Sequence, residues 1–271
     1  MFGEAIQLLW SGRRVTAGIT GVYALGLLLL VVGFSLGADF TKVREALQTE
    51  AQTASGVNSL ALQIVYLFGN TSSTPSPVSG LYQSILLVVC SLALIWALRE
   101  LRQKRAVTVK QSFYRGMTPL VPFLLVVLVI GLQFLPMTIG AYVYGIVTDY
   151  GIAVRGYEKL LALLLLVLGA LWSFRMLTSS FFAPYAVTLP NMEPQRALRE
   201  VRAVVEGRRL LVWRKILFLP LALITTIVLA ISPFIVVAPV LAPWAFFLLS
   251  CGAFAVTHAF MFVLYRELIR E

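Results

Sequence analysis

Residues 81–115 read LYQSILLVVCSLALIWALRELRQKRAVTVKQSFYR, and they indicate the fold more clearly than any other segment. Its first half, residues 81–98, carries no charged side chain and approaches the roughly 20 apolar residues that cross a bilayer core as a helix. Its second half, residues 99–115, contains six Lys and Arg side chains. An uncharged helix that runs into a basic segment is typical of a membrane-spanning helix ending in the cytoplasm.

The rest of the chain repeats this pattern. We predict six membrane crossings, at residues 15–36, 81–98, 118–147, 159–189, 216–231 and 240–265. The fifth is expected to end at the Ser232-Pro233 break. The connecting segments alternate between basic and nearly uncharged, so 18 of the 22 Lys and Arg fall on one side and four on the other. This alternation predicts a multi-pass protein of the plasma (inner) membrane with both the N and the C terminus in the cytoplasm.

The composition agrees with a membrane protein. Hydrophobic residues make up 59% of the 271, charged residues only 13%, and the mean hydropathy is +0.89. Soluble domains contain about 25% charged residues. The net charge of +10 lies beside apolar segments, so we expect the cations to meet anionic lipid headgroups and not nucleic acid. We therefore predict one all-α membrane domain over residues 1–271.

One external segment is long. Residues 39–77 form an insertion between the first two crossings, and residues 41–68 have apolar side chains at roughly helical spacing. We expect this insertion to be a binding surface for a protein partner.

Three cytoplasmic stretches resemble one another. Residues 1–14, 107–116 and 193–209 are short amphipathic segments, each containing a glycine (Gly12, Gly116 or Gly207) directly before a crossing or its basic flank. A glycine in the left-handed conformation commonly ends a helix. We predict three interfacial elbow helices, each leading into a hairpin of two crossings; the alternative is generic anchoring by basic amphipathic helices.

Three of these motifs also resemble a known family. Residues 194–209 (PQRALREVRAVVEGRR), residues 181–187 (FFAPYAV) and residues 4–12 (EAIQLLWSG) are similar to segments of a bacterial superfamily of six-helix membrane proteins. This superfamily includes the membrane domain found beside glycerophosphoryl diester phosphodiesterases, as well as uncharacterised stand-alone members. The resemblance covers essentially the whole chain and implies the fold and the location more than an activity.

Few side chains suggest chemistry. Six arginines are candidate contacts for lipid headgroups or other anions: Arg175, Arg196, Arg199, Arg202, Arg208 and Arg209. Arg175 lies within the fourth crossing, where it is either a snorkelling anchor or an anion contact in a cavity. His258 is the only histidine and is expected to be a packed, hydrogen-bonded side chain, and Gln133 a bond between helices.

No motif indicates a metal site, a cofactor or a catalytic residue. We therefore expect a non-enzymatic membrane protein, a scaffold or subunit of a cell-envelope assembly. The alternative is a transporter or permease-like protein for an anionic or lipidic small molecule, and a weaker possibility is a membrane enzyme that acts on lipid headgroups.

Overall fold

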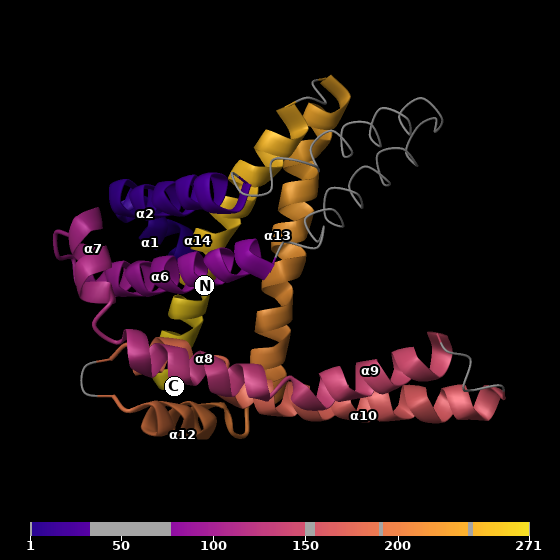
Figure 1. Ribbon diagram of the computed structural model, residues 1–271. Helices are drawn as coiled ribbons and strands as arrows, with labels where there is room; N and C mark the ends of the chain where they lie inside the picture. The colour runs from indigo at the N-terminus through magenta and orange to yellow at the C-terminus, as the bar shows by residue number, and fades with distance from the viewer. Residues whose placement is uncertain (1, 33–76, 150–154, 190–191, 238–240, 271) are drawn as a thin grey trace. The chain divides into compact units, whose positions relative to one another are not determined.

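The computed structural model describes residues 2–32, 77–149, 155–189, 192–237 and 241–270, and every regular element in these ranges is a helix (Figure 1). Five of the helical segments are long and apolar enough to cross a membrane. They are Gly80–Arg102, Leu120–Asp149, Gly156–Val187, Arg209–Phe234 and Trp244–Ile269. The all-helical character expected from the sequence is therefore confirmed for the described residues, and the five apolar helices are compatible with a multi-pass membrane protein.

The helices belong to two compact units, of which unit 1 takes in residues up to Thr118 and residues Leu217–Val263. Its elements are α1 (Phe2–Ser11), α2 (Arg13–Gly26), the π-helical segment η1 (Leu27–Val32), α6 (Pro77–Arg102), α7 (Val109–Gly116) and most of α13 (Arg209–Val237) and α14 (Ala242–Arg270). Helix α6 contacts α1, α2, η1 and α7. It is the central helix of this unit, and Leu92, Leu94 and Leu98 on it are fully buried.

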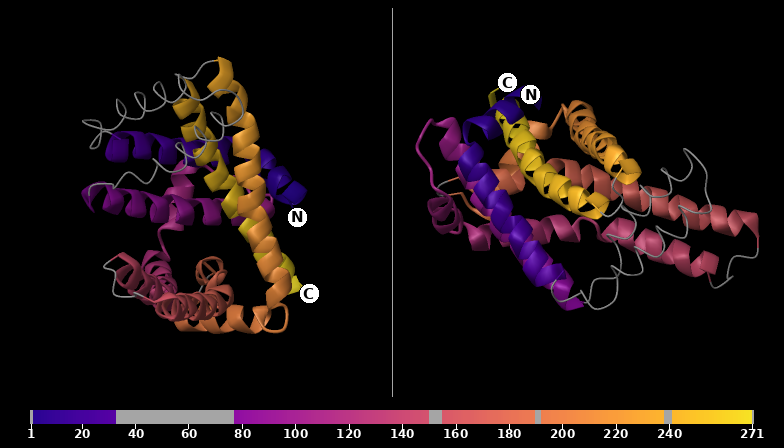
Figure 2. Two further views of the ribbon diagram at one scale, coloured as in Figure 1. Left: turned by 90° about the vertical axis from the view of Figure 1, so that its right-hand side faces the viewer. Right: turned by 90° about the horizontal axis from the view of Figure 1, so that it is seen from above.

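Unit 2 takes in residues Pro119–Ile216 and Leu264–Glu271. Its complete elements are α8 (Leu120–Leu132), α9 (Leu135–Asp149), α10 (Gly156–Ser180), α11 (Ala183–Val187) and α12 (Pro194–Val205). Helices α9 and α10 run side by side as a hairpin (Figures 1 and 2). Their backbones are close, because a Cβ on Gly140 would lie 2.9 Å from the Cα of Leu166.

The helices have different bounds from the predicted crossings. The first predicted crossing begins as α2 and η1, and its residues 33–36 lie outside the described residues. The external insertion, residues 39–77, lies outside them too, apart from Pro77, the first residue of α6. The third crossing is two helices, α8 and α9, joined by a turn at residues 133–134, and the fourth ends in the separate short helix α11.

The predicted end of the fifth crossing at Ser232-Pro233 is wrong. Helix α13 continues through Pro220 and Pro233 to Val237. A proline removes the hydrogen bond to the carbonyl four residues earlier, which for Pro233 is the carbonyl of Leu229. The Ser232 hydroxyl donates to that carbonyl oxygen at 3.0 Å. The side chain thus supplies the lost bond, and the helix does not need to end.

The predicted left-handed conformation is present at only one of the three elbow glycines. Gly207 has φ +90°, but Gly12 has φ −107°, and Gly116 is the last residue of α7 without a positive φ. The two others are needed for close approach instead. A Cβ on Gly116 would lie 3.0 Å from the Cα of Ala93, and one on Gly12 would lie 2.2 Å from the Leu101 side chain. Both positions lie against α6.

Candidate functional site

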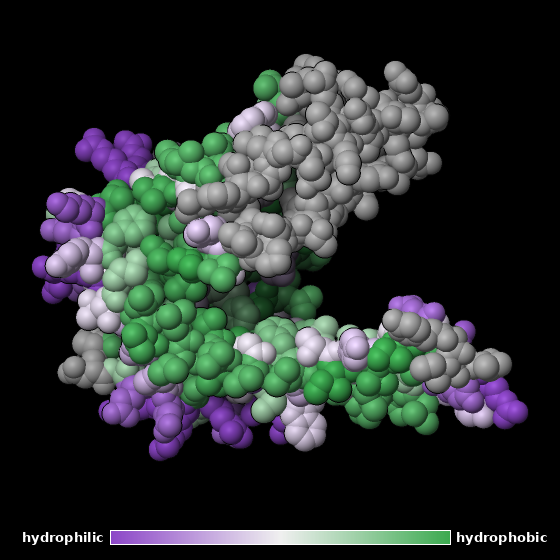
Figure 3. Space-filling view, viewed as in Figure 1, coloured by the Kyte–Doolittle hydropathy of each residue, from purple (hydrophilic) through white to green (hydrophobic). Residues whose placement is uncertain are grey.

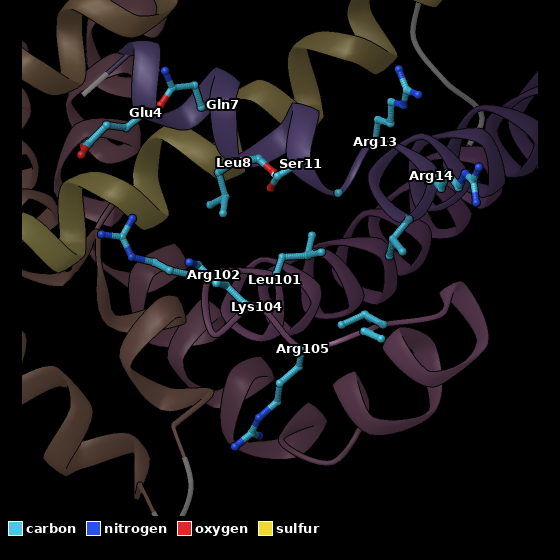
Figure 4. A pocket seen from close by; sticks show the side chains of 14 residues that line it. Glu4, Gln7, Leu8, Ser11, Arg13, Arg14, Leu101, Arg102, Lys104 and Arg105 are labelled. Carbon is cyan, nitrogen blue, oxygen red and sulfur yellow. Dashed lines mark hydrogen bonds between the residues drawn. The ribbon is translucent and has the colours of Figure 1, made fainter.

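A basic cavity of about 800 Å³ lies in unit 1, where the corner between α1 and α2 faces the C-terminal end of α6 (Figure 4). The lining residues are Glu4, Gln7, Leu8, Ser11, Gly12, Arg13, Arg14, Val15, Leu101, Arg102, Lys104, Arg105, Ala106 and Val107. Five of these side chains are cations, and one is a carboxylate. Figure 4 shows the α1 side chains on one side and those of α6 and its following loop on the other, with the cations around the rim.

The α6 side of the cavity is built by the way this helix ends. The backbone N–H of Arg105 donates to the Glu100 carbonyl at 3.2 Å, and that of Lys104 to the Leu101 carbonyl at 3.0 Å. These two bonds form a Schellman motif, in which the residue after the cap has a left-handed conformation. That residue is Lys104, with φ 56°, the only positive φ of a non-glycine residue in the described ranges. The turn places Arg102, Lys104 and Arg105 together at the cavity.

The α1–α2 side depends on Gly12. This residue is buried, and its lack of a side chain lets Leu101 pack directly against the corner. The corner is closed by hydrogen bonds, because the Ser11 hydroxyl donates to the Leu8 carbonyl at 2.8 Å and the Thr16 hydroxyl to the Gly12 carbonyl at 3.2 Å. The first turn of α2 consequently lines the cavity, with Arg13 and Arg14 in it.

The five cations differ in what they contact. The Arg13 guanidinium lies over the Trp10 ring, 5.8 Å from its centre, and Arg105 forms an ion pair with Glu100 at 3.1 Å. For the other three, Arg14, Arg102 and Lys104, the described part of the chain provides no carboxylate partner and no hydrogen-bond acceptor. Sequence reasoning counted these cations as cytoplasmic charges but did not bring them together, since the two segments are more than 80 residues apart along the chain.

The predicted arginines of residues 193–209 lie in unit 2, on or next to α12. Arg196, Arg199 and Arg202 are exposed, whereas the apolar face of the helix is buried. Arg196 forms an ion pair with Glu200 at 2.8 Å. After the helix, Arg208 is exposed and Arg209, the first residue of α13, is half-buried. Hydrophilic residues gather over α12 in the space-filling view (Figure 3).

Arg175 does not share the α12 face. It lies on α10 and is exposed there, between the exposed side chains of Phe174 and Met176. The structure thus places it on the surface of the helix hairpin, a position from which a long side chain extends toward the bilayer interface.

Polar side chains inside the apolar helices are bonded to other helices. His258 Nε2 and the Ser91 hydroxyl lie 3.0 Å apart, which joins α14 to α6 and confirms the hydrogen-bonded histidine. Gln133 donates to the Ser180 hydroxyl at 2.8 Å, which confirms the predicted bond between helices.

Two further bonds of this kind lie in unit 2. The backbone N–H of Met137 donates to the Ser173 hydroxyl at 3.1 Å, and the Trp213 indole donates to the Thr178 hydroxyl. Ser173 and Thr178 therefore act in helix packing.

The described residues offer no ligand set for a metal ion. Within these ranges, no three His, Cys, Asp or Glu side chains lie close enough together to hold one. Cys90 and Cys251 are both free thiols in buried positions of apolar helices. The chemistry that this part of the protein offers is the binding of anions by basic side chains.

Comparison with models of protein families, with curated proteins and with solved structures finds no match to this chain. Its resemblance to the membrane domain found beside glycerophosphoryl diester phosphodiesterases stays a prediction from three short motifs.

Proposed function

We propose that this protein crosses the plasma membrane six times, as three hairpins with both termini in the cytoplasm. The five long apolar helices and the start of a sixth in α2 and η1 support this topology, together with the distribution of Lys and Arg. Short helices are present at the three places where elbows are expected, namely α1, α7 and α12. In the proposed topology these helices lie in the cytoplasmic interface and carry its basic side chains.

Cysteine labelling tests this topology. The two native thiols are buried, so a new exposed cysteine should give the main signal. Tyr114→Cys, at a position that is 84% exposed on α7, should react with a membrane-impermeant reagent only after the cells are opened. Gly156→Cys, at the exposed start of α10, should react in intact cells. The reverse pattern would overturn the orientation.

Within this topology, we assign the protein the role of a non-enzymatic scaffold or subunit of a membrane assembly. The observation that carries this proposal is the use of polar side chains inside the helices. Ser91, Gln133 and Ser173 each take part in a hydrogen bond between helices. A transporter for an anionic small molecule needs polar groups that face a cavity at the level of the membrane, and here they tie helices together.

The surface of α10 gives such a protein a place to contact another membrane protein. Only 11% of its most apolar 18-residue stretch is buried. Large side chains such as Leu164, Leu168 and Trp172 are more than half exposed. Hydrophobic residues cover the α9–α10 hairpin in Figure 3. This face meets either lipid or the apolar helix of a partner, and the proposed external contact through residues 39–77 would add to it.

Purification in a mild detergent tests the scaffold role. The native protein should be recovered with a partner in fixed stoichiometry, and the partner should be lost when Trp172 and Leu168 are both changed to Ala. A matched double change on the α8 surface, Leu124→Ala with Leu128→Ala, should keep the partner, since both residues are also exposed. Recovery of the native protein alone, as a monomer, would contradict the proposal.

The transporter alternative makes a different prediction. It requires an anion site near Arg175, so Arg175→Gln should abolish uptake or binding of the transported anion. If Arg175 is a surface anchor, as its exposure on α10 favours, the same change should leave ligand binding unaltered and weaken only membrane insertion.

A further inference from the structure

We propose that the basic cavity between α1, α2 and the end of α6 binds a phosphate group, from the headgroup of an anionic lipid or from a soluble phosphate compound. This site lies outside the six arginines singled out by the sequence, and it does not depend on the scaffold role. Its volume of about 800 Å³ falls within the roughly 300–1,000 Å³ of typical ligand pockets.

The first argument is that three cations without a partner in the described part of the chain line this cavity. Arg14 comes from α2, Arg102 from the last turn of α6, and Lys104 from the loop that follows. Like charges in one place repel each other, and two other cations at this cavity, Arg13 and Arg105, already contact Trp10 and Glu100. An anion with more than one negative charge in the cavity would lower the repulsion among the remaining cations at its rim.

The second argument is the backbone of Lys104. In a Schellman motif, the left-handed position is usually a glycine, because a Cβ there is disfavoured by about 1–2 kcal/mol. This chain has a lysine with φ 56° at that position. Glycine would end the helix without this cost, so a charged side chain kept at this position at the rim of the cavity points to a role for that charge.

The third argument concerns which anion fits. Arginine presents a planar fork of N–H donors that matches the oxygens of phosphate, and lysine adds a compact charge. The exposed Gln7 side chain provides a further N–H donor on the α1 side. A phosphomonoester, with up to two charges and three terminal oxygens, can accept from several of these donors at once.

The apolar part of the lining favours a lipid as the source. Leu8, Val15 and Leu101 lie directly beside the cations. An amphiphile can place its phosphate against the cations and its glycerol and first methylene groups against these side chains. A soluble phosphate compound would use the polar lining and leave these apolar side chains without a contact.

Native mass spectrometry of the full-length protein in detergent micelles tests the proposal, with three lipids and a fatty acid as probes. Phosphatidic acid, which carries a phosphomonoester, should bind about tenfold more tightly than phosphatidylcholine, whose phosphate is neutralised by choline. Phosphatidylglycerol should be intermediate. Oleate carries a carboxylate and no phosphate; equal affinity for oleate and phosphatidic acid would overturn the proposal.

Variants locate the site. Arg14→Gln combined with Arg102→Gln should weaken the binding of phosphatidic acid by about tenfold or more. Lys110→Gln is the matched control, because Lys110 is an exposed cation of α7 that does not line the cavity. It should change the affinity by less than about twofold. If Lys110→Gln weakens binding as much as the double change does, a general basic surface binds the lipid, and the proposal fails.

Lys104→Gly separates loss of binding from loss of folding. Glycine removes the charge but accepts φ 56° without strain, so the variant should melt at the same temperature as the parent or higher, and still bind phosphatidic acid several-fold more weakly. Unchanged binding in this variant would count against the role of Lys104 and thus against the site.

Competition identifies the source of the phosphate. Inorganic pyrophosphate at millimolar concentration should not displace phosphatidic acid if the site is made for a lipid headgroup. If pyrophosphate displaces the lipid from the parent protein and fails to bind to the Arg14→Gln, Arg102→Gln variant, the site takes a soluble phosphate compound. Both results support a phosphate site. The absence of any preference of the protein for phosphate-bearing anions overturns it.

Discussion

Helix α6 and the α9–α10 hairpin are equally suited to cross a membrane but are packed in opposite ways. The mean hydropathy of their spans is about the same, 2.2 for Gly80–Arg102 and 2.2 for Gly156–Val187. Yet 44% of the 18 most apolar consecutive residues are buried in the first span, against 11% in the second. Helix α6 is surrounded by α1, α2, η1 and α7, whereas α10 is packed mainly along one side, against α9.

Apolar composition therefore determines whether a helix is suited to lipid, but not which helices pack against it. In a lipid environment an apolar side chain gains no hydrophobic stabilisation by contacting protein instead of lipid. Close contact between helices therefore depends on small residues and hydrogen bonds. In α6 the contacts come from Gly12 and Gly116 on facing elements and from Ser91. In the hairpin the close backbone contacts lie along the seam between α9 and α10, at Gly140 and Gly169.

The largest effect is expected for a Leu→Ala substitution on α6, compared with the same substitution on α10. Leu94 on α6 is 0% exposed, and Leu164 on α10 is 53% exposed. Leu94→Ala should lower the free energy of unfolding by about 3 kcal/mol, because it leaves a cavity among packed helices. Leu164→Ala should cost less than about 1 kcal/mol, since lipid or detergent fills the space. Unfolding by SDS titration in micelles measures both; equal losses would show that the hairpin is as tightly packed as α6.

A smaller loss is expected at the seam of the hairpin. A Cβ on Gly169 would lie 2.4 Å from the carbonyl oxygen of Pro136, so α9 and α10 must separate to admit it. Gly169→Ala should cost about 2 kcal/mol, measured by the same titration. Gly145 on α9 is the control, because its nearest atom would be 3.9 Å away. Gly145→Ala should be neutral or stabilising, and a similar loss at both glycines would argue against a one-sided seam.

The hydrogen bond between α6 and α14 should contribute less again. Ser91→Ala removes the partner of His258 Nε2 at 3.0 Å and should cost about 1 kcal/mol. Ser84→Ala, on the same helix, removes only a bond to the Gly80 carbonyl of its own backbone and should change the melting temperature in detergent little. If the two serines proved equivalent, the bond to His258 would not contribute to packing.

The smallest effect is expected at Gln133. Its amide nitrogen donates to Ser180, but its Oε1 atom is buried without a partner among the described residues. Gln133→Leu loses one hydrogen bond and also removes an unsatisfied oxygen, so the stability should change by less than about 0.5 kcal/mol. A loss as large as that of Ser91→Ala, measured under the same conditions, would indicate that Oε1 has a partner beyond the described residues.

Length and hydropathy were sufficient to predict an all-helical fold with helices suited to a membrane, since these quantities are local. The sequence also indicated the bonded state of His258 and Gln133, because a polar group in an apolar helix needs a partner. The sequence did not predict where α13 ends. Pro233 is a reliable sign of a helix end in water, but the Ser232 hydroxyl compensates for it, and this depends on a rotamer that no pattern records.

The basic cavity could not be predicted for a different reason. Arg14 and Arg102 belong to segments that meet only through the packing of α1 and α2 on α6. The left-handed conformation of Lys104 could not be predicted either, because lysine rarely adopts it. The exposure of the α12 arginines could be predicted, because the period of the helix separates Arg196, Arg199 and Arg202 from the buried face.

The bond between Ser232 and Leu229 also affects how the chain enters the membrane. Its two ends are three residues apart on one helix, so it forms as soon as that helix does, without help from a neighbour. In the proposed topology, helix α13 can therefore leave the translocation machinery for the lipid as a finished unit, although it contains a proline. The bond from Gln133 to Ser180 joins residues 47 positions apart and must wait until both helices have been synthesised and inserted.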